Sequence, residues 1–453
     1  MVDNHAELGG AGVNTGTVPS KTLRETALAL SGMRSRNLYG VDLSLRREAS
    51  VADFLRHEQN VKTGLNTLLS ERLAASEADV YRGTGTFVDA HTVRVLPAPA
   101  GDEVCLQAER ILIATGSSPI RPAMFPVDAN GIYDSDSILG LQHLPKNMAI
   151  IGGGVIGSEY ACTFAALGTH VHLIDGRNVL LPFLDRELSR ALAVAMERNG
   201  IQFHWTERAT ACVANEPGNF KLTLSSGESL EVDTVLVAAG RQSNTGSLNL
   251  EVAGVTANER GLIRVNEHFQ TEAADIYAAG DVIGFPALAS TSMQQARVAM
   301  RHAFGQESDS HALGLLPTGV YTIPEAGTVG KTEETLQQEG VDYVVGRAPY
   351  SANARGRIAG DVDGFLKLLF ERPAMKLAGV HIIGEQATEL VHIGLMGMLM
   401  GATAGLFADT CFNIPTLGEL FKLASLDAIS RLRTGRSLVD LPALQVRTLK
   451  LSL

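Results

Sequence analysis

A glycine-rich turn at residues 152–157 is the segment whose residue types and spacing predict chemistry most directly. It reads Gly-Gly-Gly-Val-Ile-Gly, follows the apolar run 148–151, and opens a stretch expected to be helical. In such a strand–turn–helix setting, Gly152 permits the tight turn and Gly154 lets the backbone approach a pyrophosphate, while Gly157 lets the helix pack closely on the strand. The free N–H groups at the helix start favour the anionic diphosphate. The turn therefore predicts a dinucleotide site.

Two charged residues lie where the next predicted strand, 169–175, comes to its end. Asp175 stands eighteen positions after Gly157, where a carboxylate accepts hydrogen bonds from an adenosine ribose. The competing interpretation of Asp175 is an ordinary turn residue. Arg177 follows two positions later and is placed to meet a 2′-phosphate instead. The pair leaves the choice between NAD and NADP open.

Three further apolar runs end at a glycine, namely 110–116, 234–240 and 275–280. Buried strands that stop at a glycine and recur in this way indicate two nucleotide-binding domains of similar plan. Helical spacing of apolar residues predicts one long amphipathic helix over 51–77, followed by short strands at 84–88 and 92–96.

The pattern of expected strands and helices changes after Pro317. Strands are expected at 320–324, 343–347 and 365–370, and apolar helices at 385–401 and 417–432, which together predict a separate α+β domain that mediates dimerisation. The most membrane-like stretch, 393–408, is too short to span a bilayer comfortably and is expected to be a buried interface helix.

Composition excludes several classes of partner. The net charge of −11 argues against nucleic acid and anionic membranes, although simple solubility explains that charge as well. The four cysteines are scattered with no C-x-x-C spacing, which favours a reducing compartment without structural disulfides, and no metal-ligand cluster is expected. Residues 1–5 carry no signal-peptide pattern, so we expect a cytoplasmic protein.

Several motifs, taken together, carry a family resemblance. Over residues 2–432 the chain resembles the flavoprotein disulfide reductase family, and within it most closely the soluble pyridine nucleotide transhydrogenases. The motifs that carry this resemblance are Gly9-Gly10, Pro19–Glu25 (Pro-Ser-Lys-Thr-Leu-Arg-Glu), Ala114-Thr115-Gly116-Ser117, Tyr133-Asp134-Ser135-Asp136-Ser137, Gly152–Tyr160, Tyr277-Ala-Ala-Gly-Asp281 and Tyr321-Thr-Ile-Pro-Glu325.

The resemblance implies an α/β fold with two Rossmann-like domains and a C-terminal α+β dimerisation domain. The implied boundaries are 1–145 and 266–312 for the two parts of the FAD domain, 146–265 for the NAD(P) domain and 313–453 for the interface domain. It also implies an oxidoreductase that uses FAD with NAD and NADP and forms a homodimer.

Functional residues follow from the same resemblance. Asp281 is expected to bond the ribityl chain of FAD, and Lys21 to pair with Glu159 beside the flavin as the catalytic pair. Lys21 by itself, in a Pro-Ser-Lys turn, reads as a surface charge, so only the family match gives it a role. The other implied cofactor-binding positions are Asp3, Gly9, Gly10, Gly12, Gly85, Thr115, Gly116, Gly240 and Ala289.

The residues of disulfide reduction are missing. Family members that reduce disulfides carry a Gly-Gly-x-Cys-x-x-x-x-Cys pattern, whereas Gly12 and Thr17 occupy the two sulfur positions here. Ile414 stands where those members carry a histidine before a proline. A histidine that moves protons to thiols has no task without thiols, so a flavin that passes hydride between nicotinamides is the chemistry that remains. Transhydrogenases often keep the first cysteine, which makes Gly12 a departure.

A second departure from the family pattern lies at the start of the chain. Counting back from Gly9 places Asp3 at the acidic end of the second strand of the FAD domain, so the first strand, the phosphate loop and its helix are expected to be absent. Weak or absent FAD binding is one hypothesis from this. Three functions stay open: an FAD-dependent transhydrogenase, a non-catalytic nicotinamide-nucleotide-binding remnant, and a flavin-linked NAD(P)H oxidase or quinone reductase.

Overall fold

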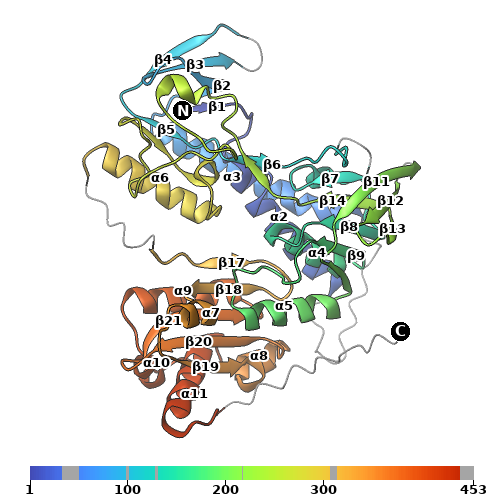
Figure 1. Ribbon diagram of the computed structural model, residues 1–453, viewed down its shortest axis with the longest axis vertical. Coiled ribbons are helices and arrows are strands. Elements are labelled where there is room, and N and C mark those ends of the chain that lie inside the picture. Colours follow the sequence, from blue (N-terminus) through green and yellow to red (C-terminus); the bar gives the residue numbers. More distant parts are fainter. Residues whose placement is uncertain (33–49, 98–100, 128–130, 217, 307–313, 439–453) are drawn as a thin grey trace. The chain divides into compact units, whose positions relative to one another are not determined.

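The structure is a computed structural model that describes residues 1–32, 50–97, 101–127, 131–216, 218–306 and 314–438. It divides into two compact units (Figure 1). Among the described residues, the first unit holds 1–27, 50–97, 101–127, 131–157, 208–216, 218–306 and 314, and the second holds 28–32, 158–207 and 315–438.

The described residues near the start of the first unit include three helices, of which the longest has a capped N-terminus. Helix α3 (Val51–Ala75) begins at Ser50, whose hydroxyl accepts from the Asp53 N–H while the Asp53 carboxylate accepts from the Ser50 N–H, a reciprocal capping box. The short helix α1 (Gly10–Asn14) lies against α3, where Asn66 donates to the Asn14 side chain at 2.8 Å. Helix α2 spans Thr17–Ser31.

The first unit also contains two parallel strand pairs and a meander. Strand β1 pairs in parallel with β2, and β2, β3 and β4 continue as antiparallel neighbours. Strand β16 pairs in parallel with β5, and helix α6 follows it. The bounds are β1 Val2–Asp3, β2 Tyr81–Phe87, β3 Thr92–Pro97, β4 Val104–Gln107, β5 Ile111–Ile113, β16 Ile276–Ala278 and α6 Ala289–Ala303.

The rest of the first unit consists of three parallel strands, an antiparallel meander and a linking ribbon. Strand β14 lies between β7 and β8, with all four of its residues buried. Strand β6 pairs antiparallel with β15. In the sequence, β6 comes before and β15 after the segment from β7 to β14. The bounds are β6 Ser117–Pro119, β7 Ile132–Asp134, β8 Asn147–Ile151, β11 Ala209–Glu216, β12 Asn219–Leu224, β13 Ser229–Val232, β14 Thr234–Val237 and β15 Arg241–Ser243.

In the second unit, a five-stranded antiparallel sheet carries most of the core. Its order is β17-β18-β21-β20-β19 (Figure 1). Leu366, Leu368 and Phe370 of β20 pack with residues of helices α9, α10 and α11 in one apolar core. Leu369 faces the opposite way and packs with Leu336 of α7. Strand β20 is therefore covered on both faces.

The second unit also contains the parallel pair β9–β10 and the helices that flank it. The bounds in this unit are α4 Val155–Ala166 (from residue 158), β9 His170–Asp175, α5 Arg186–Arg198, β10 Ile201–Trp205, β17 Thr318–Val320, β18 Ala326–Gly330, α7 Glu333–Gln338, β19 Tyr343–Pro349, α8 Ala354–Ala359, β20 Phe365–Glu371, β21 Lys376–Ile383, α9 Ala387–Leu399, α10 Ala404–Asp409 and α11 Leu420–Thr434.

A cluster of charged side chains surrounds Lys367 of β20, the strand that is covered on both faces. Lys367 is 1% exposed and its ammonium lies 2.9 Å from Asp185, the N-cap of α5, 3.1 Å from Glu187 and 2.6 Å from Glu333. Arg347 pairs with Glu187 at 2.7 Å. We refer to these five residues as the Lys367 cluster. It joins α5 to the five-stranded sheet within the second unit.

Three sequence predictions were wrong in detail. Residues 321–324 are not in a strand, because β17 ends at Val320 and Pro324 has no N–H to donate to a ladder. Lys21 lies in helix α2 and is half-buried, not in a turn. The stretch 393–408 is divided between α9 and α10, because Gly401 takes a left-handed conformation (φ 67°) between them. Among the described residues, no helix has the length and apolar character needed to cross a membrane.

Candidate cofactor-binding site

The three glycines of the predicted dinucleotide turn differ in their surroundings. Gly152 has φ 106°, and a Cβ there would collide with the carbonyl oxygen of Ala238. A Cβ on Gly157 would collide with the carbonyl oxygen of Gly152. A Cβ on Gly154 would meet no heavy atom within 4 Å. Packing therefore requires glycine at the first and third positions, whereas Gly154 borders open space, which fits a ligand that approaches the backbone.

Asp175 and Arg177 form one bidentate pair at the end of β9 in the second unit. The Arg177 Nε donates to Oδ1 of Asp175 at 2.9 Å and its Nη2 donates to Oδ2 at 2.6 Å. The hydrogen bond to Asp175 raises the pKa of Arg177. The Asp175 side chain is 8% exposed and that of Arg177 is 47% exposed. The guanidinium is thus accessible while it shields the carboxylate.

The residues that follow three strand-terminal glycines meet in the first unit. Gly116, Gly240 and Gly280 all have positive φ, and the next residues are Ser117, Arg241 and Asp281. Arg241 Nε donates to the Ser117 hydroxyl at 2.8 Å, and this hydroxyl donates to Oδ2 of Asp281 at 2.6 Å. We call this chain of contacts the Arg241 relay. It connects the ends of three strands that are far apart in sequence.

Arg241 also bonds a fourth segment. Its Nη2 donates to the Ser117 carbonyl at 2.6 Å, and its Nη1 lies 3.3 Å from both the Ser135 hydroxyl and the Asp136 carboxylate. That segment is held by Asp134, which is fully buried. Burial raises the pKa of the Asp134 carboxyl, but hydrogen bonds from Ser137 and Arg121 outweigh it and hold the pKa below its ordinary value.

Asp281 keeps one carboxylate oxygen available. Its Oδ2 accepts from Ser117, and no described residue donates to its Oδ1. The backbone beside it is fixed, because the Gly280 N–H donates to the buried Gln295 of α6 at 2.8 Å. A carboxylate oxygen of a half-exposed residue on a fixed backbone fits a ligand hydroxyl, which is the role expected for a residue that holds FAD.

Gly12, at the first sulfur position, faces Ala289. A Cβ on Gly12 would meet only the Ala289 Cβ, at 3.9 Å. Two residues predicted to line the cofactor site are therefore neighbours at the start of α6. No thiol lies at this contact, since the four cysteines are free and stand elsewhere in the sequence, at Cys105, Cys162, Cys212 and Cys411.

The other predicted residues of the first unit lie on the elements around these. Asp3 is in β1, not in an irregular terminus, and its Oδ1 accepts from the His5 N–H at 2.9 Å. A Cβ on Gly85 of β2 would meet Val2 at 3.4 Å. Gly9 (φ 100°) lies against Val13 and Leu69, and Gly10 (φ 54°) follows it. The Thr115 and Gly116 carbonyls accept from Asn244.

The predicted catalytic pair is divided between the two units. Lys21 of the first unit donates to the Ser20 hydroxyl at 3.3 Å. Glu159 of the second unit is 5% exposed and accepts from the Tyr321 N–H at 2.9 Å. Their pairing stays a prediction.

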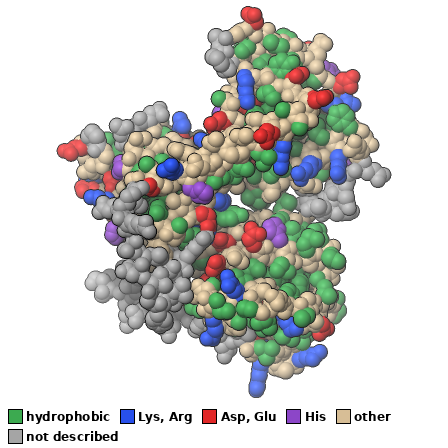
Figure 2. Space-filling model, turned by 180° about the vertical axis from the view of Figure 1, so that it is seen from behind, with side chains coloured by type: hydrophobic (Ala, Val, Ile, Leu, Met, Phe, Trp, Pro, Cys, Tyr) green, Lys and Arg blue, Asp and Glu red, His purple; other side chains and the backbone are tan. Residues whose placement is uncertain are grey.

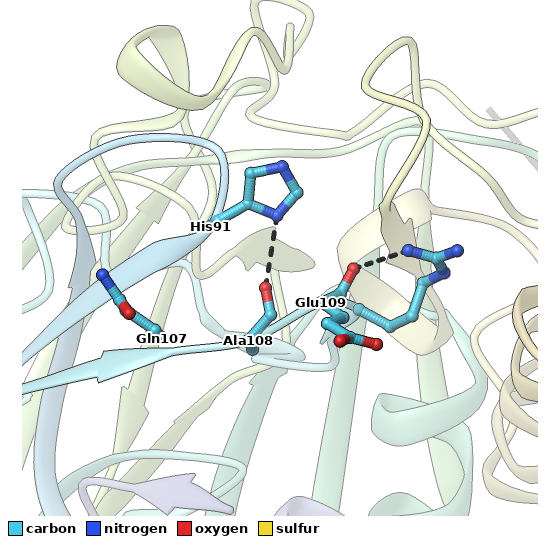
Figure 3. Close-up of a pocket in the computed structure, with 5 residues that line it drawn as sticks. His91, Gln107, Ala108 and Glu109 are labelled. Carbon is cyan, nitrogen blue, oxygen red and sulfur yellow. Dashed lines mark hydrogen bonds between the residues drawn. The ribbon is translucent and has the colours of Figure 1, made fainter.

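One open pocket of about 450 Å³ is lined by none of the predicted site residues (Figure 3). It is lined by His91, Gln107, Ala108, Glu109 and Arg110. The Arg110 guanidinium is already bound by the Glu109 carbonyl at 2.8 Å and by Asp275 at 2.6 Å. The pocket therefore offers few unsatisfied groups to a ligand. Within the described part of the chain, no group of three His, Cys, Asp or Glu side chains is placed to hold a metal.

Comparison with known families decides what this arrangement belongs to. Residues 1–303 match the model of pyridine nucleotide-disulphide oxidoreductases, and residues 316–425 match the dimerisation domain of the same proteins. The chain belongs to the pyridine nucleotide-disulphide oxidoreductase family. The α/β fold with a nucleotide-binding region and a C-terminal dimerisation domain, predicted from the sequence, is confirmed.

Individual relatives agree with this assignment. The chain is 43% identical to a soluble pyridine nucleotide transhydrogenase of Mycobacterium bovis over 96% of this chain and 92% of that one, and 38% identical to one of Colwellia psychrerythraea over 95% and 93%. Among solved structures, it is similar to the HOCl-induced flavoprotein disulfide reductase RclA of Escherichia coli, with TM-score 0.84 and 26% identity over 94% and 93% of the two chains.

Membership of this oxidoreductase family makes this chain an enzyme that uses FAD with nicotinamide nucleotides. The chain offers groups that suit them: the open backbone at Gly154 and the available oxygen of Asp281.

Sequence reasoning missed Arg241 and the part played by Ser117. A signal was present, since Ser117, Arg241 and Asp281 each follow one of the three recurrent strand-terminal glycines. Opposite charges after two of these glycines, with a hydroxyl after the third, are what a hydrogen-bonded chain needs.

Proposed function

We propose that this enzyme transfers hydride between NADPH and NAD⁺ through FAD, without a redox-active disulfide. The observation that carries the proposal is the absence of a thiol at the first sulfur position, where Gly12 faces Ala289. It is supported by relatives at 38% and 43% identity that are named soluble pyridine nucleotide transhydrogenases.

In this function, bound FAD supplies the group that accepts and returns the hydride. Asp281 would accept a hydrogen bond from the ribityl chain through Oδ1. The turn 152–157 would bind the pyrophosphate of the nicotinamide nucleotide through backbone N–H groups. Lys21 and Glu159 would be the charged residues beside the flavin. The roles of Asp3, Gly9, Gly10, Gly85, Thr115, Gly116, Gly240 and Ala289 in cofactor binding are part of the same proposal.

The Asp175–Arg177 pair suits an enzyme that must accept both nicotinamide nucleotides. With NAD, the ribose hydroxyls would bond Asp175, and with NADP the Arg177 guanidinium would turn to the 2′-phosphate. The chain's one tryptophan, Trp205, is the register partner of Asp175 on β10, so it can report on this end of the strand. Arg177→Ala should weaken NADPH binding about tenfold or more and leave NADH binding within about twofold, as measured by Trp205 fluorescence.

The decisive experiment follows reduction of a thio-NAD⁺ analogue by NADPH with the purified full-length chain. We expect stoichiometric yellow flavin and turnover that exceeds quinone or oxygen reduction. Faster quinone or oxygen reduction would favour the flavin-linked oxidase or quinone reductase. Nucleotide binding without flavin, even after FAD is added, would favour the non-catalytic remnant and agree with the hypothesis of weak FAD binding.

We further propose a homodimer, in the cytoplasm, with domain boundaries at 145, 265 and 312. The dimerisation domain supports the first of these. So do large exposed apolar side chains at Met396, Leu399, Met400, Leu406 and Ile414. In Figure 2, hydrophobic side chains gather over the lower part of the view, where this domain lies. Sedimentation of a monomer at micromolar concentration would refute the dimer, and cell fractionation tests the location.

A further inference from the structure

The Arg241 relay has a direction that chemistry alone fixes. A guanidinium has donors only, so the Ser117 oxygen must accept from Arg241. A carboxylate has acceptors only, so the single hydroxyl hydrogen of Ser117 must point to Asp281. The serine therefore has one satisfied orientation, with its hydrogen committed to Oδ2 of Asp281.

The hydrogen bond from Ser117 to Oδ2 also fixes the position of Oδ1, the other carboxylate oxygen of Asp281. Oδ2 is held at 2.6 Å by Ser117, while the backbone at Gly280 is held by Gln295. Rotation of the carboxylate would break the contact with Ser117 and leave that hydroxyl hydrogen without its acceptor. Oδ1 is consequently fixed in space although no described residue donates to it.

Arg241 is itself immobilised from several sides. It is 19% exposed as a side chain, and it contacts the Ser117 carbonyl, Ser135 and Asp136 besides the Ser117 hydroxyl. Charge-assisted hydrogen bonds of this kind are the stronger ones in proteins. The relay is thus anchored at its far end by several hydrogen bonds to the guanidinium.

We propose that Arg241 and Ser117 are positioning residues for FAD: Arg241 acts through the Ser117 hydroxyl to orient Asp281 toward a ribityl hydroxyl. This inference rests on the proposed function, because it needs FAD to bind at Asp281. It assigns a task to Arg241, which lies on the ribbon strand β15 that returns from the predicted nicotinamide-binding segment.

The test measures FAD affinity of the full-length, FAD-stripped chain by the change in FAD fluorescence on binding. Ser117→Ala should raise the Kd for FAD about tenfold, and Arg241→Gln by a similar factor, because each removes one link. Ser117→Thr, which keeps the hydroxyl, should bind like wild type. The matched control is Ser118→Ala on the same strand, whose hydroxyl donates to Asn244 outside the relay, and it should stay within about twofold.

A double-mutant cycle distinguishes a positioning role of Arg241 through Ser117 from an independent effect of each residue on FAD binding. If Arg241 acts through Ser117, the double variant should bind FAD no more than about twofold worse than the weaker single variant. Multiplicative effects, or a Ser117→Ala variant equal to Ser118→Ala, overturn the inference. If Arg241→Gln lowers the thermal midpoint of the FAD-free protein strongly, the comparison of Ser117→Ala with Ser117→Thr decides alone.

The outcomes also separate this inference from the proposed function. Wild type that transfers hydride with FAD bound, alongside an unaffected Ser117→Ala variant, defeats only the relay. Wild type that binds no FAD defeats both.

Discussion

The Arg241 relay and the Lys367 cluster are both networks of charged side chains. They differ in whether all of their polar groups are satisfied within the protein. In the Lys367 cluster, Lys367 and Asp185 are 1% and 0% exposed, and each charged side chain lies within ion-pair distance of an opposite charge. In the relay, Asp281 is half-exposed and one of its oxygens has no described donor. A closed network stabilises the fold, whereas an open one leaves an acceptor for a ligand.

The difference follows from the elements that carry them. Lys367 stands in the middle of β20, which is covered on both faces, so its charge has to be satisfied within the protein. Ser117, Arg241 and Asp281 follow the three glycines, three or four residues beyond the carboxyl ends of β5, β14 and β16, which pair in parallel with other strands. Strand ends of parallel sheets are where nucleotide ligands bind in α/β proteins.

The largest expected effect is the removal of the buried ammonium. Lys367→Met leaves Asp185, Glu187 and Glu333 without their shared cation and should lower the free energy of unfolding by about 3–5 kcal/mol. Urea unfolding measures it. The control is Lys331→Ala in the same unit, which removes exposed pairs with Glu339 and Glu371 and should cost less than about 1 kcal/mol. Equal effects would mean that the cluster is not a stabilising network.

Two isosteric changes test the comparison directly. Asp185→Asn should destabilise by about 2–3 kcal/mol, since it leaves Lys367 short of a buried counter-charge. Asp281→Asn keeps an acceptor for Ser117 and should change stability by less than about 1 kcal/mol, while FAD affinity falls. Thermal unfolding and FAD titration of both variants give the readouts. A reversed pattern, with Asp281→Asn the more destabilising, would contradict the distinction.

Within the six residues of the glycine turn, a position required by packing can likewise be compared with a position left open for a ligand. Gly152→Ala forces a Cβ at φ 106° against the Ala238 carbonyl and should cost about 1–2 kcal/mol of stability. Gly154→Ala meets open space and should stay within about 0.5 kcal/mol, yet weaken NAD binding about tenfold by occupying the approach to the pyrophosphate. Binding of NADH to Gly154→Ala at wild-type strength would argue against the turn as the site.

The smallest effect concerns pH. Burial raises the pKa of both Asp185 and Glu187, but Lys367 with His381 for the first, and Arg347 with Lys367 for the second, hold both pKa values below their ordinary range. The folded state therefore binds fewer protons than the unfolded state, so stability is fully present above about pH 5 and is lost as pH falls through the folded pKa values. Acid unfolding should be less steep in Lys367→Met. An unchanged acid transition would show that other carboxylates control it.

Long periodic segments were predictable because one face of each packs on a core. Helix α3 was expected over 51–77 and spans Val51–Ala75, and β20 was expected over 365–370 and spans Phe365–Glu371. Prediction failed where a local breaker overrode the apolar pattern, as at Pro324 and Gly401. Helix α5 and the meander β11–β13 were not predicted, although the sequence carries a signal for both: Leu188, Leu192 and Met196 recur at helical spacing in α5, and buried residues alternate along β12.

The sequence by itself determined the glycine turn, the strand-terminal glycines and the loss of both sulfur positions, because each depends on residue type and local spacing. Only the tertiary structure decided that Ser117, Arg241 and Asp281 form one hydrogen-bonded chain, or that Lys367 is buried among carboxylates. Contacts between residues more than a hundred positions apart depend on strand order and register, and no local pattern encodes either.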